Sequence, residues 1–164
     1  MLMQEFEYEL EQALQELQVQ KMPPIVVQPC PSTSRPIVRV IRGFATGKSN
    51  LTLAQRGEVR QLALMIVRSF NKGCQPIRNI RIIGHTDDTG SDAVNINVGR
   101  KRAIAVRSEM KGVVDSILTV SSIMSGIPLP TFAPPASPGE SQPAVPNTSA
   151  ANRAQNRRVV VLLD

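Results

Sequence analysis

Two kinds of apolar pattern alternate along residues 36–164, and this alternation limits the folds open to the chain. Short runs rich in Val and Ile, typical of β-strands, occupy residues 36–44, 77–84 and 157–164. Between the first two runs, apolar residues recur at the three- and four-residue spacing of an amphipathic helix. The pattern predicts an α+β fold of order β-α-β-α-β-β, with a mixed sheet of about four strands packed by two main helices.

The helix over residues 52–70 carries the clearest local signals. Thr52 and Gln55 stand at the positions of a capping box, in which each side chain binds the backbone of the other where a helix begins. Gly73 is the expected stop. One face of this helix is apolar, at Val59, Leu62, Ala63, Ile66, Val67 and Phe70.

The second half of the chain mixes helix and strand signals with proline. A second helix is expected from about Ala93 to Met110, ending at Gly112, followed by a strand over residues 117–124. Residues 126–151 contain seven prolines and are expected to form a mobile excursion without packed elements. The closing run, RRVVVLLD, is continuously apolar after its arginines, which is typical of a central strand covered on both faces.

With 164 residues and 41% hydrophobic content, the chain is long enough for one folded domain with tails. We divide it into an acidic amphipathic helix at 1–21, a Pro-rich linker at 22–36 and a domain at 37–164. The helix is expected either to dock loosely on the domain or to bind a protein partner, and a homodimer is a further option. Its apolar residues, spaced three and four apart, are Met3, Phe6, Leu10, Ala13, Leu14 and Leu17.

Charge is unevenly distributed along the chain. The formal net charge is +6, and residues 1–21 contribute −4 of it with five Glu and one Lys, which leaves residues 22–164 at +10. A basic body suggests an anionic partner such as a cell-wall polymer, a nucleic acid or a lipid surface, or else a solvated face without a partner. Cys30 and Cys74 allow at most one disulfide and leave the redox compartment open.

One charged residue, Arg102, falls in the middle of the apolar stripe of the second predicted helix. A buried guanidinium must be paired, because an unpaired buried charge is strongly destabilising and Arg keeps its proton. The nearest carboxylates are Asp87, Asp88 and Asp92, and Asp87 stands where the chain leaves the second strand. Asp87 and Arg102 form either a two-pole site for a zwitterionic ligand or a structural salt bridge. The residues that share the stripe are Asn95, Val98, Ala105, Val106 and Val113.

Three strings of the chain, FATGKSNLT, GHTDDTGSDAVNINVGRKRAIAV and NRRVVVLL, resemble one family in the same order. They are similar to the OmpA-like domain of OmpA, Pal and MotB proteins, from about Pro36 to Leu163. The resemblance implies a non-catalytic module that binds peptidoglycan and anchors to the bacterial cell wall. It also implies a place in the periplasm or cell envelope, associated with the outer membrane, although the opening residues lack the pattern of a signal peptide.

The resemblance further implies which residues bind the ligand. Asp87 matches the family acid that accepts the amino group of diaminopimelate in the stem peptide, and Arg102 matches the Arg that binds its carboxylate. Other matched positions that line the pocket are Thr86, Asn95, Val98 and Arg157. Considered by themselves, Asn95 also fits a helix cap, and Arg157 a residue that merely flanks a strand.

The chain departs from the family pattern at three places. Val98 and Gly99 stand where Leu-Ser is more common, which implies a smaller pocket wall and a softer helix. Gly47 occupies a loop position at which some relatives carry a polar residue that contacts the ligand. The Pro-rich stretch before NRRV is longer than usual.

Other classes of function are weighed against this one. His85 is the single histidine and no cysteine cluster completes a site, so we expect no catalysis, no metal and no cofactor. Nucleic-acid binding is the rival from a different class, but a basic face without interleaved aromatic residues is weak support. That face holds Arg100, Lys101, Arg107 and Lys111. A third alternative is an adaptor, since the EFEYELEQ opening faintly resembles leaders on proteins of contractile injection systems.

Overall fold

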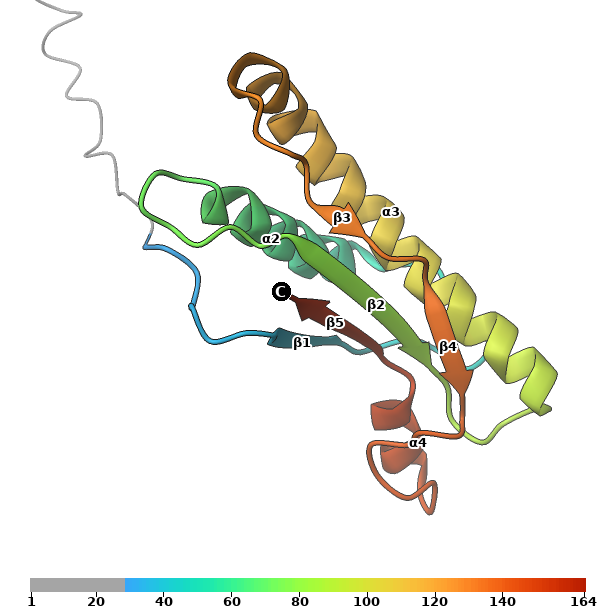
Figure 1. The fold of residues 1–164 in the computed structure, drawn as a ribbon. Coiled ribbons are helices and arrows are strands. Elements are labelled where there is room, and N and C mark those ends of the chain that lie inside the picture. The colour runs from blue at the N-terminus through green and yellow to red at the C-terminus, as the bar shows by residue number, and fades with distance from the viewer. Residues whose placement is uncertain (1–28) are drawn as a thin grey trace, which may run out of the picture.

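The structure, a computed structural model, describes residues 29–164. The predicted N-terminal helix and the first part of the linker, residues 22–28, fall outside the described part. Figure 1 shows the elements, which in chain order are β1 (Ile37–Ile41), α2 (Leu53–Ser69), β2 (Asn79–His85), α3 (Asp92–Ser125), β3 (Thr131–Phe132), β4 (Ala136–Gly139), α4 (Ala150–Asn156) and β5 (Val159–Leu163).

The strands form one mixed sheet of order β1-β5-β2-β3, in which β4 also pairs with β2. β5 runs antiparallel to both β1 and β2, whereas β3 and β4 run parallel to β2. The predicted α+β fold is confirmed. The sheet has five strands where about four were expected.

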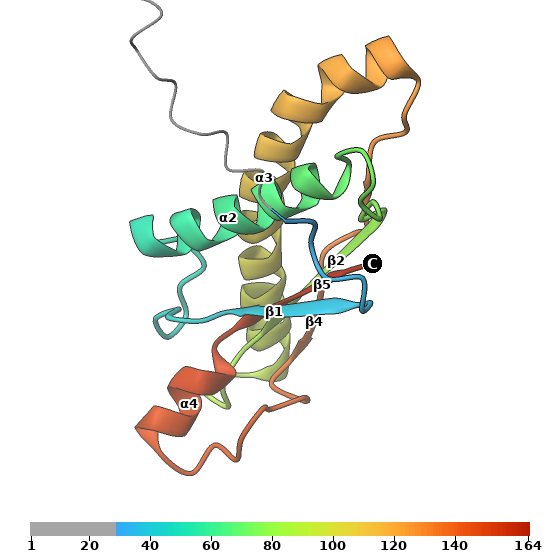
Figure 2. The same cartoon turned by 90° about the vertical axis from the view of Figure 1, so that its left-hand side faces the viewer.

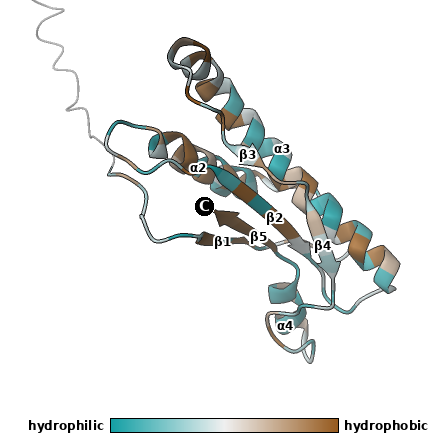
Figure 3. Ribbon diagram, viewed as in Figure 1, coloured by the Kyte–Doolittle hydropathy of each residue, from teal (hydrophilic) through white to brown (hydrophobic). Residues whose placement is uncertain are grey.

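β5 lies in the interior of the sheet as predicted, but only one of its faces is fully buried. Val159, Val161 and Leu163 belong to the core, whereas Val160 and Leu162 between them are partly exposed. The buried faces of α2 and α3 pack on the same core face. Figure 2 shows these two helices crossing each other beside the strands, and Figure 3 shows how hydrophobic β1 and β5 are.

α2 begins as its sequence predicts and ends without the expected glycine. The Thr52 hydroxyl accepts from the Gln55 backbone N–H, and the Gln55 side chain accepts from the Thr52 backbone N–H. The helix ends at Phe70, its C-cap, whose N–H bonds to preceding carbonyls of the helix. Gly73 lies in the following turn with φ +84°, so it shapes that turn and does not stop the helix.

The predicted stop at Gly112 and the predicted strand over residues 117–124 are wrong. α3 is one helix of 34 residues that passes through Gly112 and ends at Gly126, which adopts the left-handed conformation. A glycine inside a helix costs about 1 kcal/mol, whereas burying one large aliphatic side chain contributes about 1.5–3 kcal/mol. Burial therefore decides the matter, because the four-residue spacing of the core continues past the glycine at Met110, Val114 and Leu118.

The Pro-rich stretch at residues 126–151 is not free of packed elements, contrary to the expectation. It supplies β3 and β4, which pair with β2, and it leads into α4. Proline is tolerated at the outer strand of a sheet, where its missing N–H faces no partner. The buried amide of Asn156 holds the loop after β4, because it accepts from Ala144 and Val145 N–H and donates to the Val145 carbonyl.

A disulfide joins Cys30 to Cys74 and ties the start of the described chain to the loop after α2. It closes a segment with a sequence separation of 44 that contains β1 and α2. No free cysteine is found within residues 29–164.

Candidate functional site

The candidate site lies at the end of β2, where three consecutive polar residues are buried: His85, Thr86 and Asp87. Asp87 is 3% exposed, and its two carboxylate oxygens accept from Thr89 N–H at 3.0 Å and from the Arg157 guanidinium at 2.8 Å. Burial by itself raises the pKa of Asp87, but the hydrogen bonds from Arg157 and Thr89 outweigh it and hold the pKa below its usual value. Asp87 is therefore a buried carboxylate that stays ionised.

Arg157 connects Asp87 to the loop after β1. Its Nε donates to the Phe44 carbonyl at 2.6 Å, and its side chain is 17% exposed. Arg158, the next residue, instead donates to the carbonyls of Gln142 and Asn156 and is buried. The two arginines of NRRV thus differ in role, since Arg157 joins the site and Arg158 holds the loop after β4.

Arg102 is nearly fully buried, at 1% exposed, as the sequence predicted, but its partner is not a carboxylate. Three guanidinium nitrogens donate to the backbone carbonyls of Lys48, His85 and Ala45 at 2.8–2.9 Å. A direct Asp87–Arg102 salt bridge, one of the two alternatives, is absent from the described residues, and the ion pair of Asp87 is with Arg157. Backbone oxygens satisfy the guanidinium because the loop after β1 folds over it.

The charges of the three residues still act on one another. Burial lowers the pKa of Arg102 to about 10, the Asp87 charge opposes that change, and the Arg157 charge adds to it. The Arg102 guanidinium also lies 5.1 Å from the centre of the Phe44 ring. The loop that carries Phe44 turns with glycines at positive φ, and the exposed Gly47 at φ +67° is one of them. Gly47 therefore provides a turn at this position.

The other residues proposed for the pocket, Thr86, Asn95 and Val98, have no side-chain hydrogen bond or ion pair to Asp87, Arg102 or Arg157 among residues 29–164. Asn95 is buried and donates to the Glu140 carboxylate at 2.8 Å, while the N-cap of α3 is Ser91, so Asn95 is not the cap. The Thr86 hydroxyl is buried without a hydrogen-bond partner among residues 29–164, and Val98 is partly buried. The structure thus brings Asp87, Arg102 and Arg157 together, with Thr86 next to them in the chain.

Sequence reasoning missed two contributors, Phe44 and Glu140. Phe44 supplies a carbonyl to Arg157 and a ring to Arg102, and it ends an apolar strand run just before a polar loop. Its place at the end of a strand was the sequence signal that could have identified Phe44 as a site residue. Glu140 lies in the Pro-rich stretch, where no periodic pattern marks it.

A shallow pocket of about 380 Å³ opens beside this group of charges. It is lined by Arg42, Gly43, Phe44, Ala45, Ala154, Gln155 and Arg157. Within residues 29–164, no three His, Cys, Asp or Glu side chains are arranged to hold a metal. None of the helices in the described part combines the length and the apolar character needed to cross a membrane. The arrangement is suited to binding an ionic ligand, with one negative and two positive groups in a mostly buried setting.

The basic face of α3 is partly used for structure. Arg107 donates to the carbonyls of Phe132 and Ala133, and Lys111 forms an ion pair with Asp115. Arg100 and Lys101 remain exposed. Two of the four cations proposed for nucleic-acid contact are thus engaged within the domain.

A family model described as "OmpA family" matches residues 43–157. The chain belongs to the OmpA family. Among curated relatives of this OmpA-family chain, outer membrane porin F of Pseudomonas fluorescens is 30% identical over 131 residues, which are 76% of the chain and 34% of the porin. The chain thus spans about a third of the length of that relative.

Solved structures share the fold of this OmpA-family domain. The peptidoglycan-associated lipoprotein of Burkholderia pseudomallei matches with a TM-score of 0.58 at 23% identity, covering 77% of this chain and 90% of that one. The cell wall anchor of the T6SS of Pseudomonas aeruginosa matches with a TM-score of 0.56 at 19% identity, covering 77% and 79% of the two chains. At these identities the likeness concerns the fold.

Proposed function

We propose that this domain binds peptidoglycan non-covalently through the diaminopimelate moiety of the stem peptide, and so attaches the protein to the bacterial cell wall without catalysing a reaction. The observation that carries the proposal is the ionised, buried Asp87 held beside Arg157 and Arg102. Membership in the OmpA family supports it, as do the names of two matched structures, a peptidoglycan-associated lipoprotein and a cell wall anchor.

In this proposal the two poles of the site take the two poles of a zwitterion. Asp87 accepts the ammonium of diaminopimelate, and Arg157, the more exposed of the two arginines, meets its carboxylate. Arg102 holds the surrounding loop and supplies a second positive charge. Arg157 donates to Phe44 and Asp87 from Nε and Nη1, so its Nη2 remains for a ligand carboxylate. Thr86, Asn95 and Val98 complete the proposed wall.

The proposal places the domain in the periplasm or cell envelope, associated with the outer membrane. The Cys30–Cys74 disulfide supports an oxidising compartment, because such bonds rarely persist in the cytosol of ordinary bacteria. The relative with the name porin F is an outer membrane protein by that name.

The first experiment is co-sedimentation of the full chain with insoluble peptidoglycan, comparing Asp87→Asn with the wild type. Asp87→Asn keeps the shape of the side chain and removes its charge, so we expect at least about tenfold weaker pelleting from the loss of one charge-assisted contact. Asp88→Asn is the matched control, because Asp88 is the next residue and pairs with Arg153 at the exposed surface. Asp88→Asn should pellet like the wild type.

If the wild type stays in the supernatant, or if Asp87→Asn and Asp88→Asn both pellet as well as the wild type, the proposed site is wrong. A soluble stem peptide tests the finer statement, since a version with lysine in place of diaminopimelate lacks the second carboxylate. We expect binding to the diaminopimelate peptide alone. Binding that ignores this difference but falls steeply with salt would favour a general anionic-polymer or nucleic-acid binder.

A further inference from the structure

The second half of α3 presents an apolar stripe that no described element covers. Ile117, Val120 and Met124 are 42%, 62% and 81% exposed, and the stripe starts at the partly buried Val113 and continues to Ile127 just past the helix end. Successive members are separated by four, three, four and three residues, which is the heptad seam of a helix that packs against another helix. We call these five residues the α3 seam.

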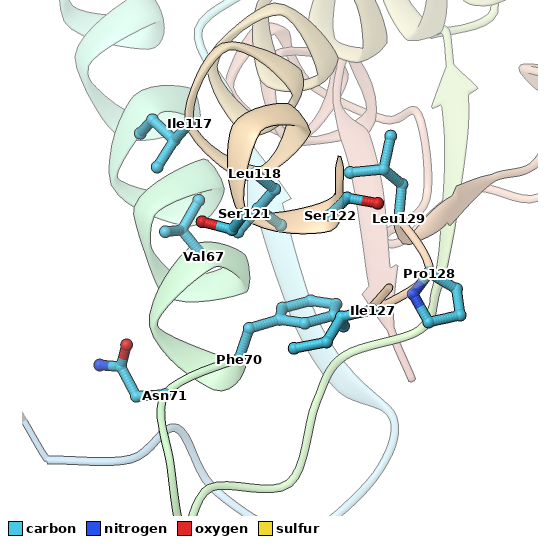
Figure 4. Close-up of a pocket in the computed structure, with 10 residues that line it drawn as sticks. All are labelled: Val67, Phe70, Asn71, Ile117, Leu118, Ser121, Ser122, Ile127, Pro128 and Leu129. Atoms are coloured by element: carbon cyan, nitrogen blue, oxygen red, sulfur yellow. The ribbon is translucent and has the colours of Figure 1, made fainter. Parts of the chain in front are cut away.

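A pocket of about 240 Å³ adjoins the α3 seam at the end of α2. Figure 4 shows Phe70, the C-cap of α2, lying beside Ile127 at this pocket, which Ile117 and Leu129 also line. One cation, Arg78, stands at its rim, since its guanidinium lies 5.4 Å from the Phe70 ring centre and donates to the Pro128 carbonyl. The site therefore favours an apolar helix that carries negative charge.

This chain contains a segment of that kind in residues 3–17. Met3, Phe6, Leu10, Ala13 and Leu17 repeat with the same heptad spacing over the same length as the α3 seam. Residues 1–21 hold five Glu and one Lys, while the single charged residue of α3 beyond Gly112, Asp115, is neutralised by Lys111. The apolar spacing of residues 3–17 thus matches the α3 seam, and their negative charge is opposite to that of Arg78 beside the pocket.

The disulfide holds residue 30 close to the pocket. Cys74 is bonded to Cys30, and its N–H donates to the carbonyl of Asn71, which lines the pocket. Residues 18–29 can span up to about 40 Å, whereas the α3 seam is about 20 Å long at helical rise. The tether therefore keeps residues 3–17 at a high effective concentration beside the seam.

We propose that residues 3–17 form an amphipathic helix that packs along the α3 seam and into the adjoining pocket of the same chain. The Glu-rich face of that helix lies outward and toward Arg78 at the rim of the pocket. A second copy of the chain is the competing occupant, because a heptad seam also serves between molecules.

Limited proteolysis of the full, oxidised chain tests this, with cleavage sites mapped by mass spectrometry. The variant Val120→Asp places a charge in the middle of the α3 seam. Ile104→Asp is the matched control. Ile104, like Val120, is a β-branched apolar residue exposed on α3, with 44% of its surface accessible, but it lies off the seam. We expect cleavage within residues 3–17 to be at least about tenfold faster in Val120→Asp than in the wild type or Ile104→Asp.

A complementary variant, Leu10→Asp, changes the proposed N-terminal helix and leaves the described domain intact. It should speed cleavage within residues 3–17 as much as Val120→Asp does. Equal cleavage rates in the wild type, in Val120→Asp and in Leu10→Asp would overturn the proposal. Light scattering distinguishes the two occupants: a wild type that stays monomeric at all concentrations supports packing within one chain. A dimer that Val120→Asp dissociates would assign the seam to a second copy instead.

Discussion

At the scale of single residues, two glycines decide how closely α3 approaches the sheet. A Cβ on Gly84 of β2 would lie 1.8 Å from the Gly99 carbonyl oxygen of α3, and a Cβ on Gly99 would lie 2.1 Å from the Ser137 hydroxyl. From sequence, Gly99 implied only a softer helix. Its actual effect is to let helix and strand meet, which brings Arg102, one helical turn later, against the end of β2.

We expect Gly84→Ala to lower the free energy of unfolding by about 3 kcal/mol or more, because the new methyl meets backbone atoms that cannot rotate away. Urea unfolding measures the change. Gly57→Ala in α2 is the comparison, since a Cβ there has nothing within 4 Å, and it should be neutral or slightly stabilising. A Gly84→Ala variant as stable as Gly57→Ala would refute the close contact.

His85 makes stability depend on pH in the mildly acidic range. Burial first, and then the charge of Arg158, lower its pKa from 6.5 to about 4. The unfolded chain takes up a proton near pH 6.5 and the folded chain does not, so stability falls as pH drops from 7 toward 4. We expect a loss of about 2 kcal/mol between pH 7 and pH 5, measured by urea unfolding.

His85→Gln should flatten the slope in this interval, and an unchanged slope would mean that another group is responsible. Asp87 acts in a lower range. Its depressed pKa stabilises the fold above an ordinary carboxyl pKa of about 4, and that contribution is lost only as pH falls further.

At the scale of elements, local signals predicted how elements begin better than where they end. The capping box of Thr52 and Gln55 requires only neighbouring residues, so the start of α2 was readable from sequence. The length of α3 depends on the core that Met110, Val114 and Leu118 reach, and residue types near Gly112 do not record that core. β3 and β4 were missed for the same reason, because their pairing with β2 involves distant residues.

The continuity of α3 leads to a prediction of opposite signs for two glycines. Gly112→Ala should raise the free energy of unfolding by about 0.5–1 kcal/mol, because alanine favours the helix and its Cβ meets nothing within 4 Å. Gly126→Ala should lower it by about 1 kcal/mol, since Gly126 caps the helix at φ +67°. Thermal unfolding monitored by circular dichroism checks both, and destabilisation by Gly112→Ala would contradict a continuous helix.

The site was predictable in part for a reason that also belongs to this scale. An Arg in an apolar helical stripe requires partners, and this identified Arg102 and the end of β2. Its partners are the carbonyl of His85 at the end of β2 and two carbonyls of the loop after β1, which no pattern of charges encodes. Arg157 became the partner of Asp87 because β5 lies beside β2, an arrangement set by the whole sheet.

At the scale of the whole molecule, the disulfide links the segment that precedes the domain to the loop after α2. Reducing Cys30–Cys74, or replacing both with Ser, should lower the free energy of unfolding by up to about 4 kcal/mol, because the unfolded chain is then no longer closed across a separation of 44 residues. Urea unfolding with and without reductant measures it. Equal midpoints under the two conditions would show that the bond adds nothing to the stability of the fold.

The prolines around β3 and β4 affect whether copies of this domain associate at high local concentration. An outer strand with free N–H groups recruits strands from neighbouring molecules and starts aggregation. Here Pro134, Pro135 and Pro138 interrupt that row of donors at the rim of the sheet next to β2. Strand addition between neighbouring copies of this domain is therefore disfavoured at the edge that β4 forms.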